Sequence, residues 1–131
     1  MYIERALEPL VRRYSENFKI VAVTGPRQVG KTTMLKHLME EEAESGVDRV
    51  YVTLDNTAIL QTAKEDPALF LQRYRPPVLI DEIQKAPELL PYIKMIVDER
   101  DDCGSVWITG SQPLHLMKAV SESLAGRVGI V

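Results

Sequence analysis

The feature of this sequence that most constrains its fold is a glycine-rich stretch between two apolar patterns. Residues 25–32 read GPRQVGKT and fit the pattern GxxxxGK[ST]. The run Ile20–Val23 before them is apolar, as in a buried strand. After them Leu35, Leu38 and Met39 recur on one face of a helix. A strand, a tight turn and a helix in this order predict a loop whose backbone N–H groups surround a phosphate, together with the N-terminal donors of the helix.

The positions of this loop have separate physical roles. Its glycines permit an unusual backbone path and a close approach to the ligand. Lys31 is expected to reach the β- and γ-phosphates, and the Thr32 hydroxyl to ligate Mg²⁺. The sequence therefore predicts a nucleoside triphosphate site with Mg²⁺. The residues expected to bind the nucleotide are Gly25, Pro26, Arg27, Gln28, Val29, Gly30, Lys31, Thr32 and Thr33.

Two carboxylates follow a second buried strand. The run Val78–Ile80 is apolar, and Asp81 and Glu82 come directly after it. Ligands of open α/β sheets bind at the carboxyl ends of the strands. We expect Asp81 to hold Mg²⁺, and Glu82 to lie at the start of the loop and activate the attacking water as a general base. The alternative is an ordinary solvated strand end.

A further polar group ends the strand expected at 105–109. Ser111 or Gln112 is placed to sense the γ-phosphate if this strand lies between the other two. The alternative for Ser111 is an N-cap, because Pro113 suits the first position of a helix. The sequence leaves both open.

Strands and helices alternate along the chain. Alternation of this kind predicts a parallel sheet with helices on both faces. The expected strands cover residues 19–24, 49–54, 78–81, 105–109 and 128–131. The expected helices cover 1–17, 31 to before Gly46, 57–64, a segment opened by Asp66-Pro67, a segment from about Leu90 to the stop at Gly104, and 113–120 with a further turn to 124.

Composition narrows the class of protein. The 131 residues carry 16 Lys and Arg against 19 Asp and Glu, a net charge of −3, which argues against binding nucleic acid over the whole surface. The single cysteine, Cys103, cannot form an internal disulfide, and no Cys/His spacing indicates zinc. No apolar run is long enough to cross a membrane. We therefore expect a cytoplasmic protein that does not bind membranes.

Four segments together resemble one family. GPRQVGKTT (25–33), VLIDEIQ (78–84), WITGSQ (107–112) and SLAGR (123–127) are similar to a family of bacterial and archaeal AAA-type ATPases. The resemblance implies a three-layer P-loop NTPase fold with a five-stranded, mostly parallel sheet in the order 5-1-4-3-2. It also implies that Glu82 is the catalytic glutamate and that Ser111 and Gln112 match the first sensor. Arg127 is then the candidate for an arginine that contacts the γ-phosphate, within a subunit or between subunits.

The resemblance also suggests an organisation and a function. Residues 1–131 are expected to form one ATPase core, with a helix at 1–17 and the sheet and helices at 18–131. The chain is expected to be a fragment that ends before a helical lid and a C-terminal domain. The expected function is Mg²⁺-dependent ATP hydrolysis to ADP and phosphate, coupled to conformational change in an attached domain or partner. The alternative is an ATP-dependent switch with little or no hydrolysis. A homo-oligomer and a protein or nucleic-acid client stay open.

Overall fold

The apolar runs form the strands of one sheet in the computed structural model, which describes residues 2–24, 30–111 and 113–131. In these residues the sheet has five strands in the order β2-β3-β4-β1-β5, and every pairing is parallel. This is the expected order counted from the other edge, so the predicted fold class is confirmed. The strands are β1 (Ile20–Thr24), β2 (Val50–Thr53), β3 (Val78–Asp81), β4 (Val106–Gly110) and β5 (Val128–Ile130).

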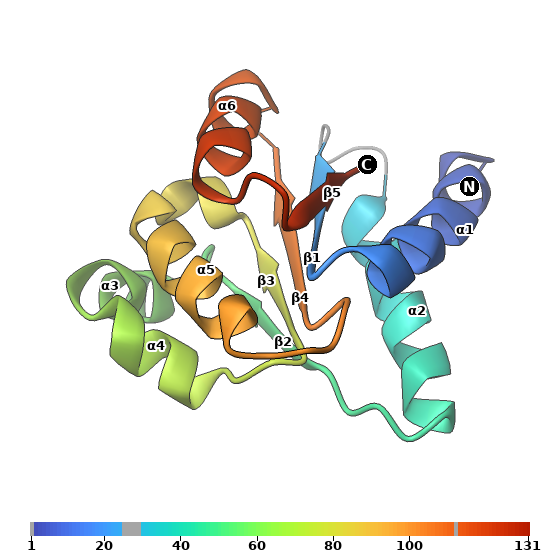
Figure 1. Ribbon diagram of the computed structural model, residues 1–131, viewed down its shortest axis with the longest axis horizontal. Helices are drawn as coiled ribbons and strands as arrows, with labels where there is room; N and C mark the ends of the chain where they lie inside the picture. Colours follow the sequence, from blue (N-terminus) through green and yellow to red (C-terminus); the bar gives the residue numbers. More distant parts are fainter. Residues whose placement is uncertain (1, 25–29, 112) are drawn as a thin grey trace.

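Helices cover both faces of the sheet, which gives three layers. Figure 1 shows α1 and α2 on one face and the remaining α-helices on the other. The helices are α1 (Tyr2–Asn17), α2 (Lys31–Glu44), α3 (Thr57–Glu65), α4 (Pro67–Arg73), α5 (Leu90–Asp98) and α6 (Pro113–Ser123), with short 3₁₀ turns η2 (Ile83–Lys85) and η3 (Pro87–Leu89). Among the helices in the described ranges, none is long and apolar enough to span a bilayer.

The three inner strands, β3, β4 and β1, contribute to two separate cores, because successive side chains point to opposite faces of the sheet. In β1, Ile20 and Ala22 pack with buried side chains of α3–α6. Val21 and Val23 pack on the other face, with Val11 of α1 and with α2. Burial on both faces explains why the central strands are continuously apolar in sequence. The sheet is therefore held between two apolar layers, and polar chemistry is restricted to its edges and ends.

The helix before β4 ends earlier than the sequence indicated. We expected it to run to Gly104, but α5 ends at Asp98. The Lys19 ammonium donates to the carbonyls of Val97 and Arg100, at 2.8 and 2.7 Å, and so satisfies carbonyls at the helix end. Gly104 serves a different purpose. With φ at +71°, it passes so close to α1 that an added Cβ would lie 2.0 Å from Ser15 Oγ.

One buried cation, Arg49, joins the amino ends of neighbouring strands (the amino edge of the sheet). Arg49, directly before β2, has a side chain that is 2% exposed. Its guanidinium binds both carboxylate oxygens of Glu42 on α2, at 2.8 and 2.9 Å. It also donates to the carbonyls of Val78, Gly104 and Ser105, at 3.2, 2.7 and 3.2 Å. The guanidinium carbon lies 3.8 Å from the centre of the Trp107 ring. All five N–H donors of Arg49 are thus used.

Because Arg49 connects α2 with the starts of three strands, we expect Arg49→Ala to destabilise the fold strongly. Removing one partner of a buried ion pair costs about 3–5 kcal/mol. Urea unfolding followed by circular dichroism measures this loss. Arg73→Ala, at an exposed residue in the last turn of α4, is the matched control and is expected to change the free energy of unfolding by less than about 0.5 kcal/mol. Equal losses in the two variants would contradict a structural role for Arg49.

Candidate functional site

The candidate site lies at the carboxyl ends of the strands (the carboxyl edge of the sheet), where α2 begins. Gly30 precedes the helix with φ of 72° and ψ of 24°, a left-handed conformation that favours glycine. The first turn of α2 holds Lys31, Thr32 and Thr33 and has no acidic residue. The N–H groups of a first helical turn have no partner within the helix and attract anions. This end of α2 is therefore suited to a phosphate.

Strand periodicity brings three polar side chains to the same face of the sheet. Leu79 of β3 packs in the core beneath α1 and α2, so Asp81, two residues later, points to that face as well. Thr53 is the register partner of Asp81 in β2. Thr109 of β4 follows Trp107 of the same core by two residues. The ends of three adjacent strands thus present polar side chains toward the start of α2.

Asp81 is the centre of a hydrogen-bond network. Its Oδ1 accepts from Thr109 Oγ1 at 2.5 Å and from Thr32 Oγ1 at 3.3 Å. Its Oδ2 accepts from Tyr51 OH at 3.1 Å and from Thr53 Oγ1 at 3.2 Å. Four hydroxyls from β2, β4 and α2 therefore hold one carboxylate that is 8% exposed. Thr32 and Asp81, both predicted as Mg²⁺ ligands, are in direct contact.

Glu82 leaves the strand through a left-handed turn. Its φ and ψ are 60° and 50°, unusual for a residue other than glycine. A strand residue after Asp81 would point to the opposite face, and the turn removes this constraint. The Glu82 N–H donates to Thr109 Oγ1 at 3.1 Å. The expectation that Glu82 lies at the start of the loop is met, although its side chain is buried, with 2% of the residue exposed.

Two neutral side chains hold the Glu82 carboxylate. Its Oε1 accepts from Gln84 Nε2 at 2.9 Å and from Ser111 Oγ at 3.0 Å. Gln84 Nε2 is also 3.3 Å from Ser111 Oγ. Gln84 Oε1 is buried, and no donor from the described part of the chain reaches it. Ser111 therefore lies against the proposed general base, and Gln84 has an unused acceptor beside it.

These residues surround one hollow. It has a volume of about 190 Å³ and is lined by Gly30, Lys31, Thr32, Thr33, Asp55, Asp81 and Glu82. Six of these seven were predicted from sequence. The seventh, Asp55, follows β2 and accepts from Lys85 Nζ at 2.6 Å. Predicted residues Gly25, Pro26, Arg27, Gln28, Val29 and Gln112 lie outside the residues that the structure describes.

The structure does not bring Arg127 to this site. Ile20 N donates to Arg127 O, so Arg127 lies at the amino edge of the sheet. The length of β1 separates that edge from Thr24, a distance of about 13 Å at 3.3 Å per residue. The Arg127 guanidinium binds both oxygens of Asp98, at 2.5 and 3.0 Å, and lowers the pKa of that carboxyl. The within-subunit alternative is thus unsupported, and a role at a neighbouring subunit stays a prediction.

Four residues that contact Asp81 or Glu82 were not predicted from the sequence: Tyr51, Thr53, Gln84 and Thr109. A signal for two of them is present. Tyr51 and Thr53 alternate with buried Val52, and polar residues at the end of β2 should lie beside those at the end of β3. Gln84 follows the strand in η2, an element that the sequence did not indicate. Its contact with Glu82 depends on the left-handed turn and has no periodic signature.

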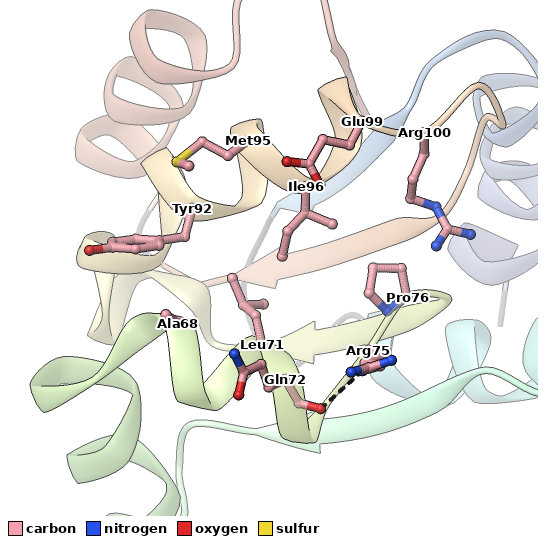
Figure 2. A pocket seen from close by; sticks show the side chains of 10 residues that line it. All are labelled: Ala68, Leu71, Gln72, Arg75, Pro76, Tyr92, Met95, Ile96, Glu99 and Arg100. Atoms are coloured by element: carbon pink, nitrogen blue, oxygen red, sulfur yellow. Dashed lines mark hydrogen bonds between the residues drawn. The ribbon is translucent and has the colours of Figure 1, made fainter.

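A larger hollow lies away from this site, between α4 and α5. Figure 2 shows Leu71 of α4 pointing toward Ile96 of α5, and Gln72 and Tyr92 also line the hollow. Its volume is about 610 Å³, and Arg75 donates to the backbone carbonyl of Gln72 at its rim. None of the predicted nucleotide-binding residues lines it. The hollow beside Asp81, although smaller, is therefore the one that combines polar groups with the predicted motifs.

Burial and the neighbouring Asp81 carboxylate raise the pKa of Tyr51 from 10.0 to about 12. A phenol whose pKa is higher in the folded chain stabilises the fold fully below pH 10, and loses this contribution as pH rises through 12. We expect the free energy of unfolding to fall between these values, and to fall less in Tyr51→Phe. Tyrosinate absorbance and urea unfolding against pH measure both effects. Tyr92→Phe, at an exposed tyrosine, is the control; an identical pH profile for Tyr51→Phe and wild type would contradict the assignment.

Comparison with known proteins connects this geometry to a family. The chain is 34% identical over 121 residues to uncharacterized proteins of Mycobacterium bovis and Mycobacterium tuberculosis. The match covers 92% of this chain but 26% of each relative, so the chain spans about a quarter of their length. In structure it is similar to a chain of C. elegans PCH-2, with a TM-score of 0.49 and 20% identity over 98% of this chain and 40% of that one.

The model of the AAA domain family matches residues 17–131. The matched range contains the whole sheet, the glycine-rich loop and both carboxylates. A match over most of the chain establishes membership and supports a nucleotide-binding function of the ATPase type. The chain belongs to the AAA domain family.

Proposed function

We propose that this chain binds ATP with Mg²⁺ and hydrolyses it to ADP and phosphate. The supporting observation is the convergence of Lys31, Thr32, Asp81 and Glu82 on one hollow at the carboxyl edge of the sheet. Phosphoryl transfer needs mainly positioning and charge neutralisation. The lysine and the helix N-terminus attract the triphosphate, and the two carboxylates are suited to a cation and to a water molecule. Adenine as the base rests on family membership alone.

The donor set at Asp81 fits Mg²⁺. This ion prefers oxygen ligands and is held in nucleotide sites by one or two protein groups together with phosphates. The Thr32 hydroxyl and the Asp81 carboxylate are adjacent oxygens, 3.3 Å apart, at the start of α2. When bound, Mg²⁺ neutralises phosphate charge. We assign Thr32 and Asp81 as the residues that hold it.

Glu82 is the proposed general base. Ser111 lies beside it and is expected to face the γ-phosphate. Ser111 Oγ is 3.0 Å from Glu82 Oε1, so a hydroxyl expected to face the γ-phosphate also touches the carboxylate. Gln84 holds the same oxygen. We assign Gln84 and Ser111 as positioning residues, which orient the Glu82 carboxylate toward the attacking water.

In the longer protein, we propose that turnover drives conformational change in an attached domain or partner. The matched region is 26% of each mycobacterial relative, so a relative has sequence for such a domain. A neighbouring copy that supplies Arg127 to the γ-phosphate belongs to the same proposal. An arginine supplied in trans raises the rate about 10³–10⁵-fold in related chemistry, so turnover is expected to rise with protein concentration.

Two substitutions separate binding from hydrolysis. Lys31→Ala is expected to weaken ATP binding by about 10–100-fold, because it removes a charge-assisted contact worth about 1.5–3 kcal/mol. Glu82→Gln is expected to keep ATP binding and to lower turnover by about 10²–10⁴-fold. Phosphate release and nucleotide binding are measured on the same samples.

Glu88→Gln, the same type of substitution at an exposed glutamate of η3, serves as the control for Glu82→Gln. Wild-type binding without turnover at any protein concentration would instead favour the nucleotide-dependent switch. Absence of ATP binding by the wild type would contradict the proposal as a whole.

Ser111→Ala distinguishes the two predictions made for this serine. If Ser111 positions Glu82, turnover falls by about 10–100-fold, because a hydrogen bond to the charged carboxylate is lost. If its main role is to cap α6, the variant loses about 1 kcal/mol of stability and keeps its turnover. We expect the first result. Phosphate release and urea unfolding of one preparation test both, with Ser121→Ala, at an exposed serine of α6, as the control.

A further inference from the structure

A second group of potential metal ligands lies on α1 and α2, which cover the face of the sheet opposite α3 and α4. Glu8 belongs to α1, and His37 and Glu41 belong to α2. His37 and Glu41 are four residues apart, which places them on one face of the helix. Figure 1 shows α1 lying beside α2. One ligand atom from each of the three residues lies within 4.8 Å of the others. Two facing helices thus present one imidazole and two carboxylates to a common point.

The spacing of these atoms is close to that of a coordination shell. His37 Nδ1 lies 3.2 Å from Glu8 Oε1 and 3.9 Å from Glu41 Oε1. Ligand atoms bound tetrahedrally to zinc at 2.0–2.2 Å are about 3.4 Å from one another. The two observed distances lie on either side of this value, and the exposed His37 side chain and the half-buried Glu41 side chain have room to adjust.

An arginine completes the surroundings of the group. Arg12 of α1 hydrogen-bonds Glu41 Oε2, the oxygen that does not face His37. Carboxylates that ligate metals are commonly held by such outer hydrogen bonds, which orient the ligating oxygen. Arg12 Nη2 also forms an ion pair with Glu8 Oε1, at 3.7 Å. The Oε1 atoms of both glutamates face the imidazole, and Arg12 offsets part of their negative charge.

We propose that Glu8, His37 and Glu41 form a site for a divalent transition metal of the Zn²⁺ class. One imidazole nitrogen with two carboxylate oxygens is a donor set for zinc-like ions, whereas Mg²⁺ and Ca²⁺ prefer oxygen alone. Three protein ligands leave a fourth position to water. The site is independent of the proposed ATPase activity, because none of its residues lines the hollow beside Asp81.

The consequence of such a site is a cross-link between two helices. Glu8 and Arg12 lie before residue 17, where the match to the AAA domain begins, whereas α2 starts in the candidate nucleotide site. A bound ion would fasten α1, most of which lies before the matched range, onto α2. Val11 of α1 already shares a core with Leu35 and Leu38 of α2, and the metal would fix the relative position of the two helices.

Titration with Zn²⁺ tests the site. The full chain is treated with a chelator, transferred to excess Mg²⁺ to occupy oxygen-only sites, and titrated in a calorimeter. We expect about one equivalent of Zn²⁺ to bind, and His37→Gln and Glu8→Gln to weaken binding by about tenfold or more. His115→Gln, at the other histidine, and Glu16→Gln, at an exposed glutamate of α1, are the matched controls and should bind as the wild type does.

Amide hydrogen exchange tests the cross-link separately. Zn²⁺ is expected to slow exchange in α1 of the wild type and to leave exchange in His37→Gln unchanged. Melting without zinc verifies that the variants fold. Equal zinc affinity in His37→Gln and wild type, or the absence of a saturable heat, would overturn the site. Zinc binding that leaves exchange in α1 unaltered would overturn the cross-link.

Discussion

The structure depends on a buried carboxylate at the end of β3, Asp81. Asp81 accepts four hydroxyl hydrogen bonds, and their donors come from three elements that are distant in sequence. A buried charge is tolerated only when hydrogen bonds replace its lost hydration. The hydrogen bonds to Asp81 therefore favour a fold in which the ends of β2 and β4 meet the first turn of α2. The same arrangement brings Lys31, Thr32 and Glu82 to one hollow, so that folding assembles the candidate site.

The two edges of the sheet use buried charge differently. At the amino edge, all five N–H groups of Arg49 donate to Glu42 or to backbone carbonyls, so none is left to bind a ligand. At the carboxyl ends of the strands, four neutral hydroxyls hold Asp81, and no donor from the described residues reaches Gln84 Oε1. Because these hydroxyls carry no charge, the Asp81 carboxylate still attracts a cation. The amino edge therefore stabilises the fold, and the carboxyl edge retains the capacity to bind.

Local sequence patterns predicted most of the fold and the acidic half of the site. Apolar runs such as Val78–Ile80 need burial on both faces, and the glycine-rich loop fixes the place of Lys31. Contacts that depend on tertiary geometry were missed. Carbonyls at the end of α5 are bound by Lys19, about eighty residues away in the chain. Gln84 reaches Glu82 only because a left-handed turn follows β3. Neither contact produces a periodicity, so propensity alone cannot reveal them.

The attachments of α2 restrict how this protein can respond to a nucleotide. Its first turn is tied to Asp81 through Thr32, its middle packs on α1, and Glu42 near its end is bound by the buried Arg49. A helix fixed at three levels along about 21 Å moves only if a buried ion pair breaks. Gln84 and Ser111, by contrast, lie in a short 3₁₀ turn and directly after a strand, and they share one carboxylate oxygen. We therefore expect a rearrangement on nucleotide binding to need the least free energy in the segments after β3 and β4, beside Glu82, while α2 stays in place.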